Sequence, residues 1–240
     1  MDNPSQTDTN VKRKKPERRF SWQFSLRTLL IVVSLICIAL GLYIGPKTRR
    51  HNQVLAIEAV KGIVIYRPHE EESWMVEQLR NYLPQDWFDE ITSVFLQETD
   101  ADDTTLEEIK SLVRLDYLDL RRTRVTDAGL VHLKGLVGLE SLILVDTRIT
   151  DMGMENLSGL SDLKRLFLDK TGITDTGLDK LKGLTKLEYL SLNFTYITDN
   201  GLEKLNGLTD LEYLLLEGTR VSEAGATALL KALPDCQIYF

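Results

Sequence analysis

The chain has 240 residues, 43% hydrophobic and 27% charged, so it can build a packed core and is neither disordered nor wholly membrane-embedded. Residues 1–27 carry seven Lys or Arg and three acids, which leaves 22 of the 29 basic and 33 of the 36 acidic residues in 28–240. Because an acidic body repels phosphate backbones, we expect no nucleic-acid binding. Cys37 and Cys236 supply neither a disulfide framework nor a paired metal motif.

The N-terminal 45 residues predict a basic cytoplasmic tail over 1–27 and a transmembrane helix, a signal anchor, over 28–45. The second segment has 18 uncharged residues, close to the minimum for crossing a hydrocarbon core of roughly 30 Å. More positive charge precedes it than follows it, which predicts a cell-membrane protein with its body outside the cytoplasm. Two alternatives are a signal peptide cleaved near Gly41, which would release the protein, and a buried core helix.

Residues 46–98 mix helix-like and strand-like stretches. A helical pattern ends at Gly62, an apolar strand-like run covers 63–66, and a second helical pattern covers 74–83. The segment directly precedes a repeated region, whose first unit would need cover from water. We therefore predict an N-terminal α/β cap over 46–98 that includes the first strand.

A pattern recurs every 24 residues through 99–240. Thr-Arg-Val-Thr-Asp-Ala-Gly, which begins at Thr123, returns in related form at Thr147, Thr171 and Thr195, and more weakly at Thr219. In each unit a Leu-x-Leu stretch alternates as a short strand would, and leucines at three-residue steps then predict a short helix. One unit cannot bury its own apolar face, so the units are expected to stack into a solenoid.

The polar positions of the repeat are expected to serve structure. The acid of each unit is predicted to cap its own helix, with a cation-binding ridge as the alternative. The glycines after Lys134, Lys182 and Asn206 are predicted to end the helices at positive φ. The first threonines are predicted to bond between coils. The acids are Asp127, Asp151, Asp175, Asp199 and Glu223, and the threonines are Thr123, Thr147, Thr171, Thr195 and Thr219.

The pattern resembles leucine-rich repeats over about 88–240. It is similar to the cysteine-containing subclass known from F-box proteins, with Thr where that subclass often has Cys or Asn. No F-box-like region precedes the repeats, so a ubiquitin-adaptor role does not carry over. The layout resembles that of small bacterial membrane-anchored leucine-rich-repeat proteins. The resemblance implies an α/β solenoid with a curved parallel sheet on its concave side and short helices on its convex side.

Three columns of outward-facing strand residues are expected on the concave face. They combine tyrosines and large apolar residues with charges of both signs, a composition typical of protein-binding surfaces. The β-propensity of aromatic and β-branched residues would also place them there. The predicted binding residues are Phe95, Tyr117, Asp119, Arg121, Ile143, Val145, Arg165, Phe167, Asp169, Tyr189, Asn193, Tyr213, Leu215 and Glu217.

The sequence favours binding over catalysis. It has no His-x-x-x-His motif, no nucleophile elbow and no phosphate-binding glycine loop, so we expect neither an enzyme nor a cofactor. The predicted function is a membrane-anchored interaction module that binds a protein of unknown identity through its concave face. A self-associating envelope scaffold is the alternative, which leaves homo-oligomerisation open.

Overall fold

The computed structural model describes residues 51–67 and 90–240. These residues lie within one compact unit, Ile44–Phe240. The predicted tail and anchor over 1–45 lie outside the described residues. Among the residues that are described, no helix combines the length and the apolar character needed to cross a membrane. The anchor over 28–45 therefore stays a prediction.

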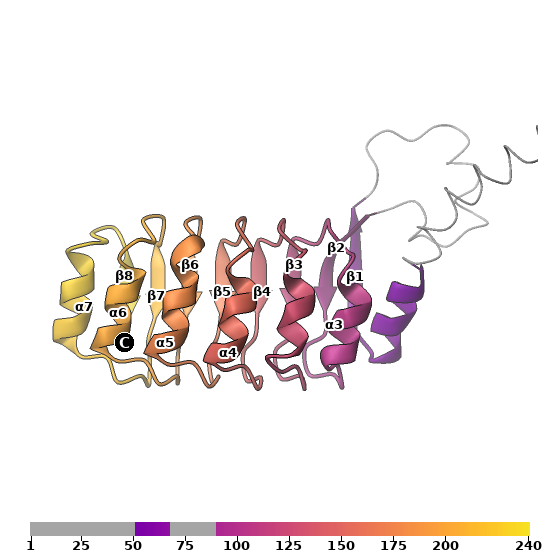
Figure 1. Cartoon of the computed structure of the whole chain (residues 1–240), viewed down its shortest axis with the longest axis horizontal. Helices are drawn as coiled ribbons and strands as arrows, with labels where there is room; N and C mark the ends of the chain where they lie inside the picture. The colour runs from indigo at the N-terminus through magenta and orange to yellow at the C-terminus, as the bar shows by residue number, and fades with distance from the viewer. Residues whose placement is uncertain (1–50, 68–89) are drawn as a thin grey trace, which may run out of the picture. The chain divides into compact units, whose positions relative to one another are not determined.

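The described strands form an eight-stranded sheet in chain order (Figure 1). β1 (Ile63–Arg67) is antiparallel to β2 (Glu90–Phe95), and every later pair is parallel. Each residue of a parallel strand lies beside the residue one unit later, as Leu118, Leu142 and Leu166 do. The remaining strands are β3 (Tyr117–Asp119), β4 (Ser141–Ile143), β5 (Arg165–Phe167), β6 (Tyr189–Ser191), β7 (Tyr213–Leu215) and β8 (Gln237–Tyr239).

The helices form a second layer against one face of this sheet (Figure 1). In the middle units, α4, α5 and α6 are each a single α-turn continued as a 3₁₀ turn, and η2 is 3₁₀ throughout. This geometry suits leucines at three-residue steps, because positions i and i+3 eclipse in a 3₁₀-helix. The helices are α3 (Asp103–Ile109), η2 (Gly129–Leu133), α4 (Asp151–Met154), η3 (Glu155–Leu157), α5 (Asp175–Leu178), η4 (Asp179–Gly183), α6 (Asp199–Leu202), η5 (Glu203–Leu205) and α7 (Glu223–Leu230).

The core lies between the two layers and is built from the repeated leucines and isoleucines, nearly all fully buried. At its N-terminal end, a helix over 51–59 adds Val54 and Ile57 to the same cluster. Gln53 of this helix donates from Nε2 to the carbonyl of Glu108 at 2.8 Å. These contacts join the helix to α3. The cap over 46–98 stays a prediction, because its residues 46–50 and 68–89 lie outside the described residues.

The tight turn after each strand uses a left-handed backbone. Arg122, Asp146, Lys170 and Phe194 have φ between 53° and 56°, and the last equivalent position is Gly218 at 69°. The threonine that follows each of these positions donates its hydroxyl to the leucine carbonyl three residues earlier, as Thr171 Oγ1 does to Leu168. The predicted threonine ladder between coils is therefore wrong, since each hydroxyl braces the turn of its own coil.

The prediction that helices end at positive-φ glycines is also wrong. Among the described glycines, Gly218 alone has a positive φ. The residue that ends η2, Lys134, is right-handed, and the chain leaves through successive three-residue turns, with Leu136 N bonded to Leu133 O at 2.9 Å. A 3₁₀ ending satisfies the last carbonyls without a left-handed residue.

Candidate protein-binding face

The register of the sheet is held on the helix side by one aspartate per coil. Asp151 accepts the backbone N–H of Thr174 at 2.8 Å and its hydroxyl at 2.5 Å, and Asp175 does the same to Thr198 at 2.8 and 2.6 Å. Equivalent bridges join Asp103 to Thr126, Asp127 to Thr150 and Asp199 to Ser222. Both oxygens of each carboxylate are thus used to join neighbouring coils.

These bridges correct the prediction that each aspartate caps its own helix. The N-caps of α4, α5 and α6 are Thr150, Thr174 and Thr198, whose side chains accept the N–H two residues later. The aspartate is the first helical residue, so its carboxylate is free to reach the next coil. Among residues 51–67 and 90–240, no group of His, Cys, Asp or Glu is arranged to hold a metal ion.

The repeated glycine accommodates the same carboxylate. A Cβ added to Gly177 would lie 2.4 Å from Oδ1 of Asp151, and one added to Gly201 would lie 2.3 Å from Oδ1 of Asp175. Such distances are far inside van der Waals contact. The Thr-Asp-x-Gly motif therefore acts across two coils: the aspartate of one unit occupies the space left by the glycine of the next.

On the other side of the sheet, the predicted binding residues fall into three aligned columns. We call this side the open face. The first column contains Tyr117, Arg165, Tyr189 and Tyr213, and the second contains Phe95, Asp119, Ile143, Phe167 and Leu215. The third continues two residues beyond each strand end, with Arg121, Val145, Asp169, Asn193 and Glu217.

The outer strands add residues that the repeat pattern missed. Ile63 pairs with Phe95, and Ile65 pairs with Ser93, so both extend the open face at β1. Tyr239 pairs with Leu215 and extends it at β8. All three side chains are exposed. The 24-residue spacing could have identified Tyr239, whereas the antiparallel β1 lies outside the repeat.

The open face is less exposed than predicted. Asp119, Ile143 and Asp169 are only 1%, 5% and 9% exposed. Neighbouring strands are about 4.8 Å apart, so large side chains on adjacent coils shield smaller ones from water. The other predicted residues are partly or fully exposed: Phe95, Tyr117, Arg121, Val145, Arg165, Phe167, Tyr189, Asn193, Tyr213, Leu215 and Glu217.

Aromatic rings form two clusters on this face. The rings of Phe95 and Tyr117 have centroids 4.9 Å apart, those of Phe167 and Tyr189 are 5.0 Å apart, and Tyr189 lies 5.8 Å from Tyr213. Burial raises the pKa of the Tyr117 and Tyr189 hydroxyls, and the nearby carboxylates Asp119 and Asp169 raise it further. Both tyrosines therefore stay neutral and can donate hydrogen bonds at physiological pH.

Two polar groups accompany the rings. Asp119 accepts Nε of Arg121 at 2.9 and 3.0 Å and is 2.7 Å from Nη2. This pairing raises the pKa of the Arg121 guanidinium. Farther along, Ser191 Oγ donates to Asp169 at 2.6 Å and accepts from Asn193 Nδ2 at 3.1 Å. Hydrogen bonds thus hold the side chains of Asp119, Arg121 and Asp169 in defined positions on the open face.

Residues 138–197, which include β4 to β6, match the family model described as leucine rich repeat. The chain carries leucine-rich repeats. No curated protein matches the sequence.

Three solved structures resemble the chain. Internalin C2 of Listeria monocytogenes is 27% identical with a TM-score of 0.48, over 62% of this chain and 70% of that one. A leucine-rich-repeat protein of Leptospira interrogans is 25% identical, with a TM-score of 0.47, and another Listeria internalin is 21% identical, with a TM-score of 0.48. These last two alignments cover 56% and 69% of this chain but only 33% and 54% of those proteins. Because these TM-scores are below 0.5, the assignment of leucine-rich repeats rests on the family-model match over residues 138–197.

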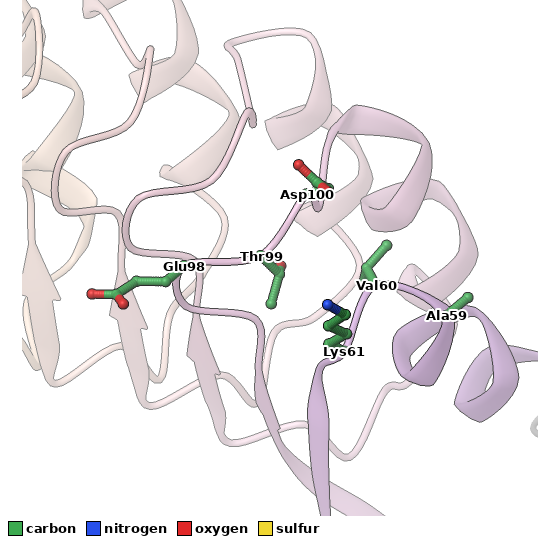
Figure 2. Close-up of a pocket in the computed structure, with 6 residues that line it drawn as sticks. All are labelled: Ala59, Val60, Lys61, Glu98, Thr99 and Asp100. Carbon is green, nitrogen blue, oxygen red and sulfur yellow. The ribbon is translucent and has the colours of Figure 1, made fainter.

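Apart from the open face, a hollow of about 230 Å³ lies between the end of the helix over 51–59 and the turn over 98–100 (Figure 2). Its carboxylates are already used: Glu98 is 2.6 Å from Arg122, and Asp100 is 2.6 Å from Arg124. Cys236 is buried, which raises the pKa of its thiol to about 11 and makes it a poor nucleophile. Neither feature offers a better candidate site than the open face.

Proposed function

We propose that this protein is a membrane-anchored interaction module that binds another protein through the open face of its leucine-rich repeats. The observation that carries the proposal is the pair of aromatic clusters, whose rings are partly exposed on an otherwise tightly packed sheet. Tyrosine and arginine dominate the binding energy of protein interfaces, and exposed apolar patches commonly mark them. Stacked repeats also present extended surfaces suited to protein partners.

The interface has a direct test in a charged variant. Phe167 and Leu215 are partly exposed, so changing both to Glu places charge on the open face without opening the core. The matched control is Val131→Glu with Met152→Glu, at exposed apolar positions on the helix layer. Full-length proteins are crosslinked in their native membrane and purified, and the bound proteins are identified by mass spectrometry.

We expect the wild type and the helix-layer variant to retain the same partner and the open-face variant to lose it by tenfold or more, on the order of a buried hot spot. Circular dichroism checks that each variant is folded. Equal capture by all three proteins would contradict the open face as the binding site. If the wild type captures only further copies of this chain and the open-face variant captures none, the self-associating scaffold is favoured.

The membrane anchor forms a separate part of the proposal. Its support is the uncharged segment over 28–45 behind a basic tail, which favours a cytoplasmic N-terminus and repeats outside the cytoplasm. We expect a phosphatase that is active only outside the cytoplasm to be active when fused after residue 240, and the protein to stay in the membrane fraction after alkaline washing. Deleting 28–45 should abolish both results. Loss of an N-terminal epitope tag from the mature protein would instead indicate cleavage near Gly41.

A further inference from the structure

The two aromatic clusters on the open face share a geometry. Phe95 and Tyr117 recur three repeat units later as Phe167 and Tyr189. The ring centroids are 4.9 and 5.0 Å apart, and the planes are inclined by 35° and 33°. The same two coil positions therefore hold the same ring pair at two places along the sheet.

In the first cluster the chain supplies its own guanidinium. Arg121 binds both oxygens of Asp119 through Nε, and Nη2 is also 2.7 Å from Oδ2. Tyr117 contributes to the raised pKa of Arg121, because its hydroxyl lies near the guanidinium. A guanidinium paired with a carboxylate is held by charge-assisted hydrogen bonds, and aromatic faces also attract guanidinium groups.

In the second cluster the carboxylate is present and the arginine is not. Asn193 replaces Arg121, and Ser191 replaces Asp119. Ser191 hydrogen-bonds Asp169 at 2.6 Å, so the Asp169 carboxylate lies next to the position that Asp119 occupies in the first cluster. Its negative charge raises the pKa of Tyr189, which also places it near the ring pair.

Asp169 lacks a cationic partner within the described part of the chain. It is only 9% exposed, and in residues 51–67 and 90–240 no Lys, Arg or His forms an ion pair with it. The nearest cation along the chain is Lys170, the next residue, but its Nζ lies over the ring of Phe194, 5.7 Å from the ring centroid. A buried carboxylate without a cation is costly, and a partner that supplies the cation would relieve that cost.

We propose that Asp169, Phe167 and Tyr189 form a subsite that binds an arginine side chain of the protein partner. This inference rests on the proposed function and names the chemistry of the partner. The guanidinium would donate to the carboxylate of Asp169, as Arg121 donates to that of Asp119, and would lie beside the rings of Phe167 and Tyr189. Tyr213, whose ring is 5.8 Å from that of Tyr189, extends the aromatic wall. The exposed Glu217, in the same column as Asp169, adds to the attraction for a cationic segment.

The test uses a mixture of nine-residue peptides with randomised flanks and a central Arg, Lys, citrulline or Gln. Full-length protein in detergent retains peptides, which are identified by mass spectrometry. Asp169→Asn removes the charge while keeping an oxygen for Ser191. Asp210→Asn, at an exposed carboxylate away from the open face, is the control with the same change in net charge. Phe167→Glu with Leu215→Glu disables the open face as a whole.

We expect arginine peptides to be enriched roughly tenfold or more over citrulline peptides by the wild type and by Asp210→Asn, as for loss of a charge-assisted pair. Asp169→Asn should lose this enrichment. Equal retention of arginine and citrulline peptides, or enrichment that survives Asp169→Asn, would overturn the subsite. Peptides retained regardless of their central residue, but lost from the doubly charged variant, would overturn the subsite and leave the proposed function standing. Failure to retain any peptide would count against both.

Discussion

Replacing Gly201 with alanine should lower the free energy of unfolding by about 2–3 kcal/mol, because the new methyl group would occupy the space of a carboxylate from the preceding coil. The added Cβ would lie 2.3 Å from Oδ1 and 2.9 Å from Cγ of Asp175. That carboxylate cannot move aside freely, since it holds the N–H and the hydroxyl of Thr198. The loss should outweigh the gain of about 1 kcal/mol that alanine normally brings to a helix.

Gly159→Ala is the matched control. Nothing lies within 4 Å of a Cβ at this position, and its φ is outside the left-handed range. We expect its stability to stay within about 0.5 kcal/mol of the wild type, measured by urea denaturation of the full-length protein followed by circular dichroism. In an Asp175→Ala background, Gly201→Ala should cost less than in the wild type, with a coupling of about 1 kcal/mol. Equal costs in both backgrounds would show that the two residues do not compete for space.

Asp175→Ala should itself destabilise the protein by about 2–3 kcal/mol, because two hydrogen bonds to a charged acceptor disappear and the N–H of Thr198 loses its partner. Asp175→Asn, which keeps one acceptor oxygen, should fall between the alanine variant and the wild type. The same denaturation experiment measures all three proteins.

Asp162→Ala provides the comparison for a different kind of contact between coils. Asp162 also reaches a residue one unit later, Lys186 at 2.6 Å, but both side chains are largely exposed to water. Exposed ion pairs contribute little, so this variant should unfold almost as the wild type does. If Asp162→Ala and Asp175→Ala proved equally destabilising, the two hydrogen bonds and partial burial of the aspartate bridge would not be the source of its strength.

The strand register could be predicted because the 24-residue period fixes it. Leu118, Leu142 and Leu166 align with one another and are fully buried, as a strand with one buried face requires. The short helices follow from the three-residue leucine steps, although their 3₁₀ character does not. The alternation of Leu-x-Leu also correctly placed the side chains of the three columns on the opposite side of the sheet.

The roles of the polar residues could not be predicted in the same way. A repeat shows which residues recur, but not whether Asp151 contacts its own coil or the next one. The burial of Asp169 depends on neighbouring side chains on other coils, which the spacing within one unit does not describe. The contribution of Ile63 and Ile65 follows from antiparallel pairing outside the repeat, so no periodic signal could reveal it.

The bridge between neighbouring coils also limits how such a gene can change length. At each contact between neighbouring units, the earlier unit supplies the aspartate and the later unit supplies the glycine that leaves room for it. Deleting or duplicating one whole 24-residue unit would therefore still place an aspartate opposite a glycine and a threonine or serine at every contact between units. An insertion of any other length within a strand or helix would separate a carboxylate from its threonine. Evolution, or an engineer, can therefore lengthen the solenoid in whole-unit steps without redesigning this bridge.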